Sequence, residues 1–436
     1  MAIALLSHEV SGLTLGKPSL AWLAASASVR VALIALKQNV CISEISVWDC
    51  APGAVDHQKK NDFSEHSPCR TCRCVGKICL QMIICYLATD DSLSNLSAAL
   101  NAPITALLEN NATIHVQHID PGASLLEALV AIGRGAQNLV VQITDSLEKH
   151  GHSLRSNISL HKRLLTRKVL SQNGRKVLSQ NAHHGLNYCW LTHEDLLRFL
   201  LGHINVFSPL PLMSIKELGI IDSDVVIVGI DEETSSNLEA IKFACSNQTA
   251  VAVVDKSKSI NGSFQLLSEI SRATFQSCDE TAAVALASCS VGSFLAYVQD
   301  WRSTPHMLME SMSEKLARMS VSSNLREQNL DVVQLLHDLE ISSDDEFGVV
   351  SPTGPHEVLH RHTFAQFHGI AHAIVGRSHS DPLCCRPSSS MIAVLMQALA
   401  HRELYVWVTN EEDNTLAGIV TLEAILKVLL DGLDLT

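Results

Sequence analysis

The sequence predicts a mixed α/β fold assembled from four β-α-β-β-α units that associate as two pairs. Two observations indicate this fold: a capped helix start recurs four times along the chain, and a β-rich run follows each of these starts. A single unit of this kind leaves an apolar face on its small sheet, and a second unit can cover that face. The composition, with 47% apolar and 18% charged residues, is that of a globular protein.

The recurring helix start is a serine followed by apolar residues at helical spacing. It occurs at Ser28, Ser124, Ser236 and Ser390. A serine hydroxyl can accept a hydrogen bond from a backbone N–H of the first helical turn, which otherwise has no partner in the helix. Two copies add a glutamate three residues later, Glu127 and Glu239, and these predict capping boxes.

A β-rich run follows each helix start. The four runs begin at Ile45, Asn138, Thr249 and Leu404. Next come an insert of variable length, a second predicted strand and a second predicted helix, as in residues 188–202 and 417–430. Four copies in the same order predict a repeated module rather than four unrelated helix–strand pairs.

The charge and hydropathy of the chain argue against several classes of partner. The formal net charge is −13 at pH 7, which argues against general affinity for nucleic acid or anionic membranes. No apolar run approaches the roughly 18 residues needed to span a bilayer. The first residues do not have the basic region of a secretory signal, and they do not indicate an organellar transit peptide. We therefore expect no nucleic-acid or membrane partner and a cytoplasmic location, with the nucleus as the open alternative.

Thirteen cysteines are scattered along the chain, most of them in apolar runs, so we expect reduced and mostly buried thiols. The run from Cys69 to Cys74, with His57 and His66 upstream, resembles part of a zinc site, but a second pair of ligands is missing. We interpret it as a Cys-rich loop without metal. A redox role is the intermediate alternative, because the arginines that flank these cysteines favour thiolates. The histidine-rich stretch at 356–372 is interpreted as a polar linker.

The repeated pattern resembles the cystathionine-β-synthase (CBS) domain. The opening Pro-x-x-Ser-Leu-x-Glu-Ala-Leu of that domain is matched from Pro121 to Leu129, and its Gly-Ile-Val-Thr strand from Gly418 to Thr421. Nearly the whole chain is similar to plant proteins that consist of CBS domains alone (CBSX-like). Four modules in one chain also resemble the γ regulatory subunit of SNF1-related and AMP-activated kinases. The resemblance implies four CBS modules in two Bateman pairs, with adenosine ligands bound in the clefts between modules.

The repeats also predict the domain boundaries. We expect modules at 1–90, 98–205, 212–300 and 385–436, a loop insert at 145–187 in the second module, and a variable linker at 302–384. Residues 207–213 are the expected hinge between the pairs, because two prolines there should block regular structure.

The resemblance implies a site motif as well. In nucleotide-binding CBS modules the second strand ends in Thr/Ser-x-x-Asp, whose hydroxyl lies near the phosphate or ribose and whose carboxylate accepts hydrogen bonds from the ribose diol. The second module keeps this motif as Thr192 and Asp195, and the fourth keeps the hydroxyl, Thr421, with Ala424 in place of the carboxylate. The predicted ligand-binding residues are therefore Thr192, Asp195 and Thr421. The open alternative for the second module is a helix N-cap with an acidic first turn.

The other two modules depart from the motif. The first has Cys79 and Met82 at the two positions, and residues 262–269 of the third offer no match. We therefore expect one occupied adenosine site or none.

We predict that the protein is not an enzyme. No Ser/His/Asp order, Walker loop or dinucleotide glycine fingerprint stands out, so no catalytic residue, metal or cofactor is assigned. The expected function is that of a CBS-domain regulatory protein, which senses an adenosine nucleotide or acts as an adaptor and so modulates a partner protein. The candidate ligands are AMP, ATP and S-adenosylmethionine, and the candidate partners are a kinase or a redox enzyme. A γ-type subunit of an SNF1-related kinase, a ligand-free scaffold and a homodimer are the open alternatives.

Overall fold

The computed structural model describes most of the chain. The described residues are 6–38, 42–50, 72–109, 116–143, 186–259, 262–276, 278, 280–299 and 381–433. They contain four three-stranded sheets, and each sheet belongs to one β-α-β-β-α module. The predicted mixed α/β fold of four modules is therefore confirmed.

Each module consists of a first strand, a helix, two further strands and a second helix. Module 1 contains β1 (Trp22–Ala24), α3 (Val29–Gln38), β2 (Ile45–Asp49), β3 (Arg73–Ile78) and α4 (Leu80–Leu87). Module 2 contains β4 (Val116–Ile119), α8 (Leu125–Gly133), β5 (Asn138–Gln142), β6 (Tyr188–Leu191) and α10 (His193–Leu201). Module 3 contains β7 (Ile227–Gly229), α11 (Leu238–Ser246), β8 (Val251–Val254), β9 (Leu266–Ile270) and α12 (Thr281–Ser288). Module 4 contains β10 (Cys384–Cys385), α17 (Met391–His401), β11 (Tyr405–Thr409), β12 (Leu416–Thr421) and α18 (Leu422–Asp431). Further helices are α2 (Val10–Leu13), α5 (Asp90–Ser94), α6 (Leu96–Asn101), α7 (Thr105–Glu109) and α13 (Val291–Gln299).

All four sheets share one topology. The middle strand of each sheet is parallel to the first strand of its module and antiparallel to the third. The intervening helix supplies the crossover that a parallel pair requires. The middle strands β2, β5, β8 and β11 lie on the four predicted β-rich runs, which confirms that part of the repeat.

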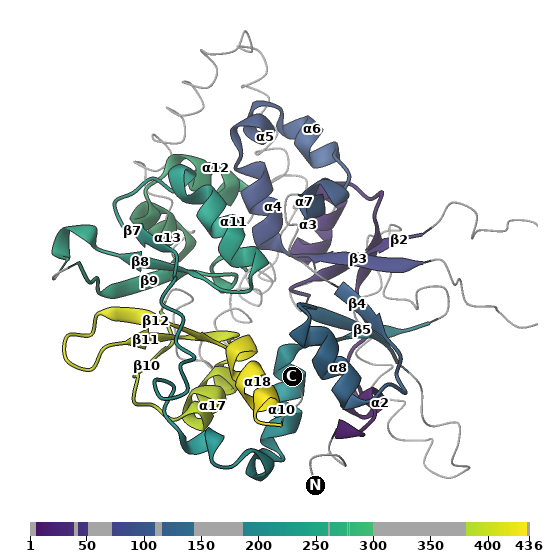
Figure 1. Ribbon diagram of the computed structural model, residues 1–436. Coiled ribbons are helices and arrows are strands. Elements are labelled where there is room, and N and C mark those ends of the chain that lie inside the picture. Colours follow the sequence, from purple (N-terminus) through teal and green to yellow (C-terminus); the bar gives the residue numbers. More distant parts are fainter. Residues whose placement is uncertain are drawn as a thin grey trace, which may run out of the picture.

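The modules form two pairs through their sheets. The sheets of modules 1 and 2 enclose an apolar cluster around Trp48, Cys74 and Val140. The sheets of modules 3 and 4 enclose a second cluster around Ala252 and Trp407. In Figure 1 these pairs lie on opposite sides of the molecule, with β3 beside β4 on one side and β9 above β12 on the other. The predicted pairing of consecutive modules is thus confirmed.

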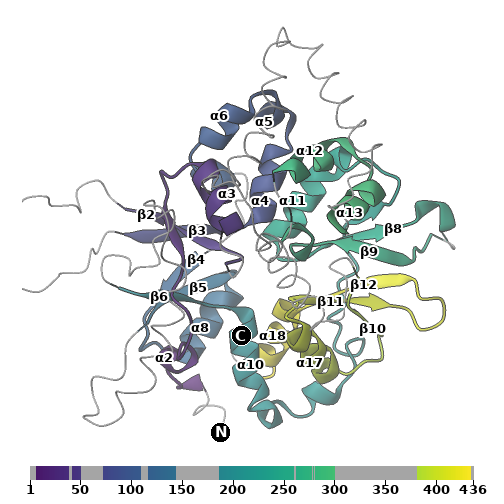
Figure 2. The same ribbon diagram turned by 180° about the vertical axis from the view of Figure 1, so that it is seen from behind.

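The helices then join the two pairs. Helices of modules 1 and 3 share one apolar core, in which α4 packs against α11 and α12. Helices of modules 2 and 4 share the other core, in which α10 packs against α18. Figure 2 shows the same two helical layers from behind, one above and one below the sheets. Each module therefore contacts one neighbour through its sheet and another through its helices.

Three of the four predicted serine caps are confirmed. The Ser124 hydroxyl accepts a hydrogen bond from the Glu127 N–H at 3.3 Å, and the Glu127 carboxylate accepts one from the Ser124 N–H at 3.1 Å. This reciprocal pair is the predicted capping box of α8. Ser28 and Ser390 also cap their helices, α3 and α17. Their hydroxyls accept hydrogen bonds from the Val31 and Ala393 N–H groups.

The fourth predicted cap, at Ser236, is wrong. Ser236 lies inside a short 3-10 helix, η4 (Ser235–Asn237), and α11 begins directly after it. Glu239 therefore lies in the first turn of α11 without a serine cap opposite it, and its carboxylate accepts a hydrogen bond from Lys242 Nζ at 2.8 Å. The physical reason is that a 3-10 turn often precedes an α-helix, and it shifts the helix start by one or two residues.

In each pair, the segment that precedes the first strand of the first module packs on the second module, and we call it the leader segment. The segment before module 1 packs on module 2, where Glu9 forms a β-bridge with Ser124. The segment before module 3 packs on module 4, where Ser214 forms the equivalent bridge with Ser390. Because of this packing, Lys17 of the first leader segment reaches module 2.

The connection between the pairs is more regular than predicted. It contains two 3-10 helices, η2 (Ile204–Phe207) and η3 (Leu210–Leu212), and Pro211 is buried. The expectation that its prolines block regular structure is wrong, because a proline fits the first positions of a helical turn, where its missing N–H costs no hydrogen bond. The module boundaries predicted from the sequence stay a prediction.

None of the described helices is long and apolar enough to cross a membrane.

Most of the described cysteines are buried, as expected from their place in apolar runs. The buried ones are Cys74, Cys79, Cys85, Cys189, Cys289 and Cys385. Burial raises the pKa of Cys85 to about 12, so this thiol stays protonated at neutral pH.

Candidate functional site

The Thr192–Asp195 motif lies where β6 ends and α10 begins. The backbone of Thr192 is extended, with φ −116° and ψ 169°, and it caps the helix that follows. Its hydroxyl and its N–H both donate to Asp195 Oδ2 at 2.8 Å, and the Asp195 N–H lies 3.4 Å from the same hydroxyl oxygen. The two residues therefore form a capping box, so the alternative interpretation of the motif as a helix cap is confirmed.

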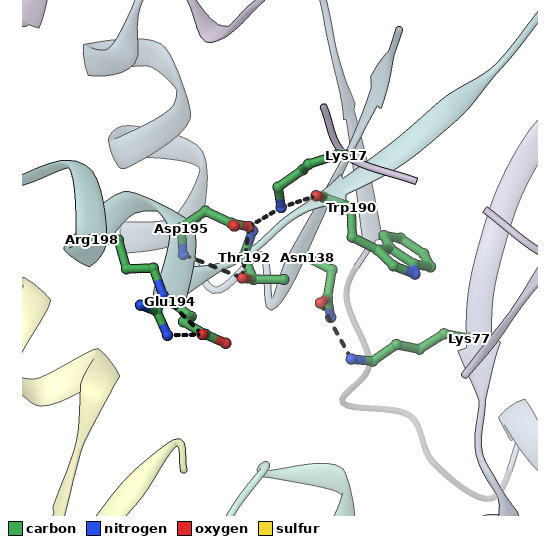
Figure 3. Close-up of polar contacts among 8 residues, drawn as sticks. All are labelled: Lys17, Lys77, Asn138, Trp190, Thr192, Glu194, Asp195 and Arg198. Atoms are coloured by element: carbon green, nitrogen blue, oxygen red, sulfur yellow. Dashed lines mark hydrogen bonds and ion pairs between the residues drawn. The ribbon is translucent and has the colours of Figure 1, made fainter. Parts of the chain in front are cut away.

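Lys17 from the first leader segment closes over this capping box. Its ammonium donates to the Trp190 carbonyl at 2.7 Å and forms an ion pair with Asp195 Oδ2. Figure 3 shows Lys17 approaching the carboxylate from the side of β6, with the Thr192 side chain on the other side of it. Lys17 and Asp195 are 22% and 20% exposed, so this pair is accessible to solvent on one side.

The second oxygen of the Asp195 carboxylate can still act as an acceptor. The contacts with Thr192 and Lys17 go to Oδ2, and among the described residues none donates to Oδ1. An ionised carboxylate oxygen can accept two hydrogen bonds. Oδ1 can therefore receive the hydroxyls of a vicinal diol while Oδ2 holds the cap.

Polar groups of modules 1 and 2 lie beside the motif. His193, which follows Thr192, is buried, and burial together with the charge of Lys77 lowers its pKa to about 4. Its ring is therefore neutral at pH 7. Lys77 of β3 donates to Asn138 Oδ1 of β5 at 3.2 Å, as Figure 3 shows. The Asn138 Nδ2 donor is buried, and no described residue accepts from it.

Glu44 holds cations from two modules. Its carboxylate accepts a hydrogen bond from Lys77 Nζ at 2.9 Å and also forms an ion pair with Arg272 of module 3. Burial would raise the pKa of Glu44, but the charges of Arg272 and Lys77 outweigh burial and lower the pKa to about 2. Glu44 is thus an internal anion between a lysine and an arginine that belong to different pairs.

The third predicted residue, Thr421, lies apart from the other two. It ends β12 and caps α18, with its hydroxyl accepting from the Ala424 N–H at 3.1 Å. Ala424 has no carboxylate to return the hydrogen bond, and Glu423 is exposed. The structure therefore brings Thr192 and Asp195 together in module 2, whereas Thr421 belongs to module 4 in the other pair, although α18 packs against α10.

In module 3 the corresponding position was missed by the sequence interpretation. It is Ser271, directly after β9, whose N–H donates to Thr274 Oγ1 at 3.0 Å. The helix that should start here is delayed, because residues 273–275 form a 3-10 helix and α12 begins only at Thr281. The sequence signal for this position is the Ser-x-x-Thr pattern that directly follows β9, and it has no carboxylate. In module 1, Cys79 at the N-cap makes no side-chain cap.

The interface between modules 3 and 4 contains a buried carboxylate. Glu269 of β9 is 4% exposed and accepts hydrogen bonds from Tyr405 Oη at 3.0 Å and Trp407 Nε1 at 2.5 Å. Burial, and then the charge of Glu269, raises the pKa of Tyr405 well above its ordinary value, so the phenol stays a donor. Aromatic side chains of β11 thus occupy this sheet interface.

The two predicted metal alternatives fall largely outside the described residues. Residues 57–71 and 356–372 lie outside them, so the predictions of a Cys-rich loop and a polar linker remain untested. Cys72 and Cys74 are described, and they flank Arg73 at the start of β3.

Comparisons with known proteins identify one CBS domain in this chain and two relatives that contain CBS domains. Residues 375–431 match the sequence profile of the CBS domain. The CBS domain-containing protein CBSX5 of Arabidopsis thaliana is 35% identical to this chain, over 100% of this chain and 99% of the relative. The CBS domain-containing protein CBSX6 of the same plant is 28% identical, over 96% of this chain and 92% of the relative.

Two solved structures are similar over most of the chain at low identity. Protein MJ1225 from Methanocaldococcus jannaschii has a TM-score of 0.47 and 13% identity, over 96% of this chain and 99% of that one. A conserved protein from Pyrococcus horikoshii has a TM-score of 0.34 and 13% identity, over 97% of this chain and 100% of that one.

Proposed function

The chain is a member of the family of CBS domain-containing proteins, and we propose that it is a non-catalytic regulatory protein that binds an adenosine-type ligand beside Thr192 and Asp195. AMP, ATP and S-adenosylmethionine all carry the vicinal ribose diol that a carboxylate oxygen can accept. A ligand that binds one arrangement of the modules more tightly than another shifts the population of these arrangements. A partner protein, such as a kinase or a redox enzyme, would then respond to that shift.

The observation that carries this proposal is that the two carboxylate oxygens of Asp195 have different surroundings. Oδ2 is held by the Thr192 cap and by Lys17, and Oδ1 faces no donor among the described residues. The carboxylate is thereby fixed in orientation before a ligand arrives. Fixing an acceptor in advance reduces the entropy lost on binding.

A second observation supports a polar ligand at the same place. The Asn138 Nδ2 donor is buried without an acceptor among the described residues, and a buried donor in this state costs about 1–3 kcal/mol. The Asn138 side chain is hydrogen-bonded to Lys77, whose charge also lowers the pKa of His193, the residue after Thr192. An acceptor supplied by a ligand, such as a ring nitrogen or a phosphate oxygen, would satisfy Asn138.

A ligand-free scaffold is the second candidate, and the ion pairs favour it. Lys17 already forms an ion pair with Asp195, and Glu44 already forms ion pairs with both Lys77 and Arg272. A site whose charged groups already have partners within the chain can serve to hold the modules together. The γ-type kinase subunit rests on the number of modules alone, and none of the contacts above distinguishes it from other regulatory proteins.

Calorimetric titration separates the two candidates. AMP, ATP and S-adenosylmethionine are titrated separately into the wild type, Asp195→Ala and Glu423→Ala. A hydrogen bond to a charged acceptor contributes about 1.5–3 kcal/mol, so we expect Asp195→Ala to weaken binding at least about tenfold. Glu423→Ala is the matched control, because it removes a first-turn carboxylate from α18 without touching the site.

The outcomes of this titration are distinct. If Asp195→Ala binds a ligand as tightly as the wild type does, the assigned site is wrong. If the wild type binds none of the three ligands, the scaffold function replaces the sensor function. Thermal unfolding of each variant is measured alongside, since losing the capping box also costs about 0.5–2 kcal/mol of stability.

A further inference from the structure

The antiparallel pair β2–β3 ends with one cysteine on each strand. In the register of this pair, Asp49 lies opposite Arg73. The next residues outward are Cys50 and Cys72, and both lie within the described part of the chain. Continuing the register by one position places the two cysteines directly opposite each other.

Both side chains point to the same face of the sheet. Residues two apart on a strand share a face, so Cys50 lies on the face of Trp48 and Cys72 on the face of Cys74. Trp48 and Cys74 belong to the apolar cluster between modules 1 and 2, and both outer cysteines pack against that cluster. Cys72 also lies close enough to Tyr188 to influence its phenol.

The position is of the close, non-hydrogen-bonded type. The Cys74 N–H donates to His118 Nε2 of β4 at 3.0 Å, so it points away from β2. Cys72, two residues away on the same strand, has the same orientation. Directly opposite residues of this type have Cα atoms about 4.5 Å apart, which lies within the range of about 4.4–6.8 Å that a disulfide spans.

We propose that Cys50 and Cys72 form a reversible disulfide that ties the outer ends of β2 and β3 together. The oxidant is a small-molecule disulfide such as oxidised glutathione. One cysteine thiolate attacks it, forms a mixed disulfide and releases one glutathione thiol. The second cysteine thiolate then attacks the mixed disulfide and releases the other. The two protons of the protein thiols end on the two released thiols, and the oxidant is reduced by two electrons.

The neighbouring Cys74 does not compete for this reaction. It is 1% exposed, and burial raises its pKa to about 12, so it presents no thiolate at neutral pH. Cys50 and Cys72 are half-buried and therefore accessible to a small oxidant. Burial of Cys74 and the register of β2 and β3 therefore select Cys50 and Cys72 as the two cysteines that join.

The test is peptide mapping of the native full-length chain after equilibration in glutathione buffers of increasing oxidised fraction. Remaining thiols are alkylated and the protein is cleaved with trypsin, which places Cys69, Cys72 and Cys74 on three different peptides. We expect the peptide 71–73 to be joined to the peptide 38–59. A further cleavage after Glu44 then assigns the bond to Cys50 rather than to Cys41.

Single variants provide the matched controls. In Cys50→Ser and in Cys72→Ser the second exchange step has no partner, so the remaining cysteine should accumulate as a glutathione adduct. Cys384 is exposed beside the buried Cys385 on alternate faces of β10, so it reports accessibility to the oxidant without forming an internal bond. The proposal is overturned if Cys72 is found joined to Cys69 or Cys41. It is also overturned if Cys72 stays alkylated under conditions that convert Cys384 fully.

Discussion

The module 1–2 pair and the module 3–4 pair have the same topology, but they differ in where each places a carboxylate and in what that carboxylate binds. In modules 1 and 2, Asp195 is partly exposed and keeps one carboxylate oxygen without a donor among the described residues. In modules 3 and 4, the carboxylate is Glu269, which is buried between the sheets and accepts from Tyr405 and Trp407. One pair therefore presents an acceptor to solvent, whereas the other uses its acceptor to bind its own aromatic side chains.

The third position after the capping threonine decides whether the cap includes a carboxylate, and the proposed ligand site depends on that carboxylate. Thr192 and Thr421 cap equivalent helices with the same hydroxyl geometry. Asp195 adds a charged acceptor that the cap uses only in part, and Ala424 adds none. The helix forms with either residue, Asp195 or Ala424, at this position, because the threonine hydroxyl alone caps its first turn.

The largest effect is expected from removing the buried carboxylate of modules 3 and 4. Glu269→Leu leaves the Trp407 Nε1–H and the Tyr405 hydroxyl buried without this acceptor. Hydrogen bonds to a charged group contribute about 1.5–3 kcal/mol each, so losing both should lower the free energy of unfolding by about 3–6 kcal/mol. Urea unfolding followed by tryptophan fluorescence measures this loss.

Two controls accompany that prediction. Glu239→Leu removes a carboxylate that is 86% exposed, and its effect should stay within about 0.5 kcal/mol. Adding Tyr405→Phe to Glu269→Leu should recover part of the loss, because one orphaned donor disappears with its acceptor. A loss below about 1 kcal/mol in Glu269→Leu would mean that the buried carboxylate does not hold this interface.

The second prediction concerns the anion that joins the two pairs. The pKa of Glu44 is about 2 in the folded chain, against an ordinary value of 4.5. Because the folded pKa is the lower one, ionised Glu44 stabilises the fold above pH about 4.5, and this contribution is lost as the pH falls towards about 2. The difference corresponds to about 3 kcal/mol.

The measurement is the free energy of unfolding of the wild type and of Glu44→Gln between pH 7 and pH about 2.5. The gap between the two proteins should be largest at pH 7 and should narrow through the window between about 4.5 and 2. An unchanging gap would show that the ionised form of Glu44 is not what Lys77 and Arg272 stabilise.

Local patterns in the sequence predicted most of the architecture. Serine caps and β-rich runs act over a few residues, so the starts of α3, α8 and α17 and the four middle strands could be found without knowing the fold. The cap predicted at Ser236 is wrong because a 3-10 turn forms at the same residues in place of the cap. Ser271 was not predicted, because β9 runs up to Ile270, past residues 262–269, which offer no match to the motif.

The charged partners of the site could not be predicted in this way. Lys17 reaches Asp195 because the first leader segment crosses to module 2, and Arg272 reaches Glu44 because modules 1 and 3 share a helical core. Both ion pairs join residues that are far apart in the chain, so no local spacing indicates them. They depend on how the modules are assembled, which the sequence pattern of one module does not specify.

The smallest effect is expected from transferring the capping box to the other pair. Ala424→Asp places a carboxylate three residues after Thr421, as in module 2, and should raise the free energy of unfolding by about 0.5–1 kcal/mol. The same substitution in a Thr421→Val background should give less, because the reciprocal hydroxyl is gone. Equal gains in both backgrounds would mean that the helix dipole alone is responsible.

The most direct test of the central claim combines one change in the protein with one in the ligand. AMP and 2′,3′-dideoxy-AMP are titrated into the wild type and into Asp195→Ala, which gives a cycle of four affinities. If Asp195 accepts from the ribose diol, each single change should weaken binding at least about tenfold. The two changes together should then cost little more than one of them, with a coupling energy of about 1.5–3 kcal/mol. Additive losses, with no coupling, would show that the diol is not bound by Asp195 and would contradict the assigned site.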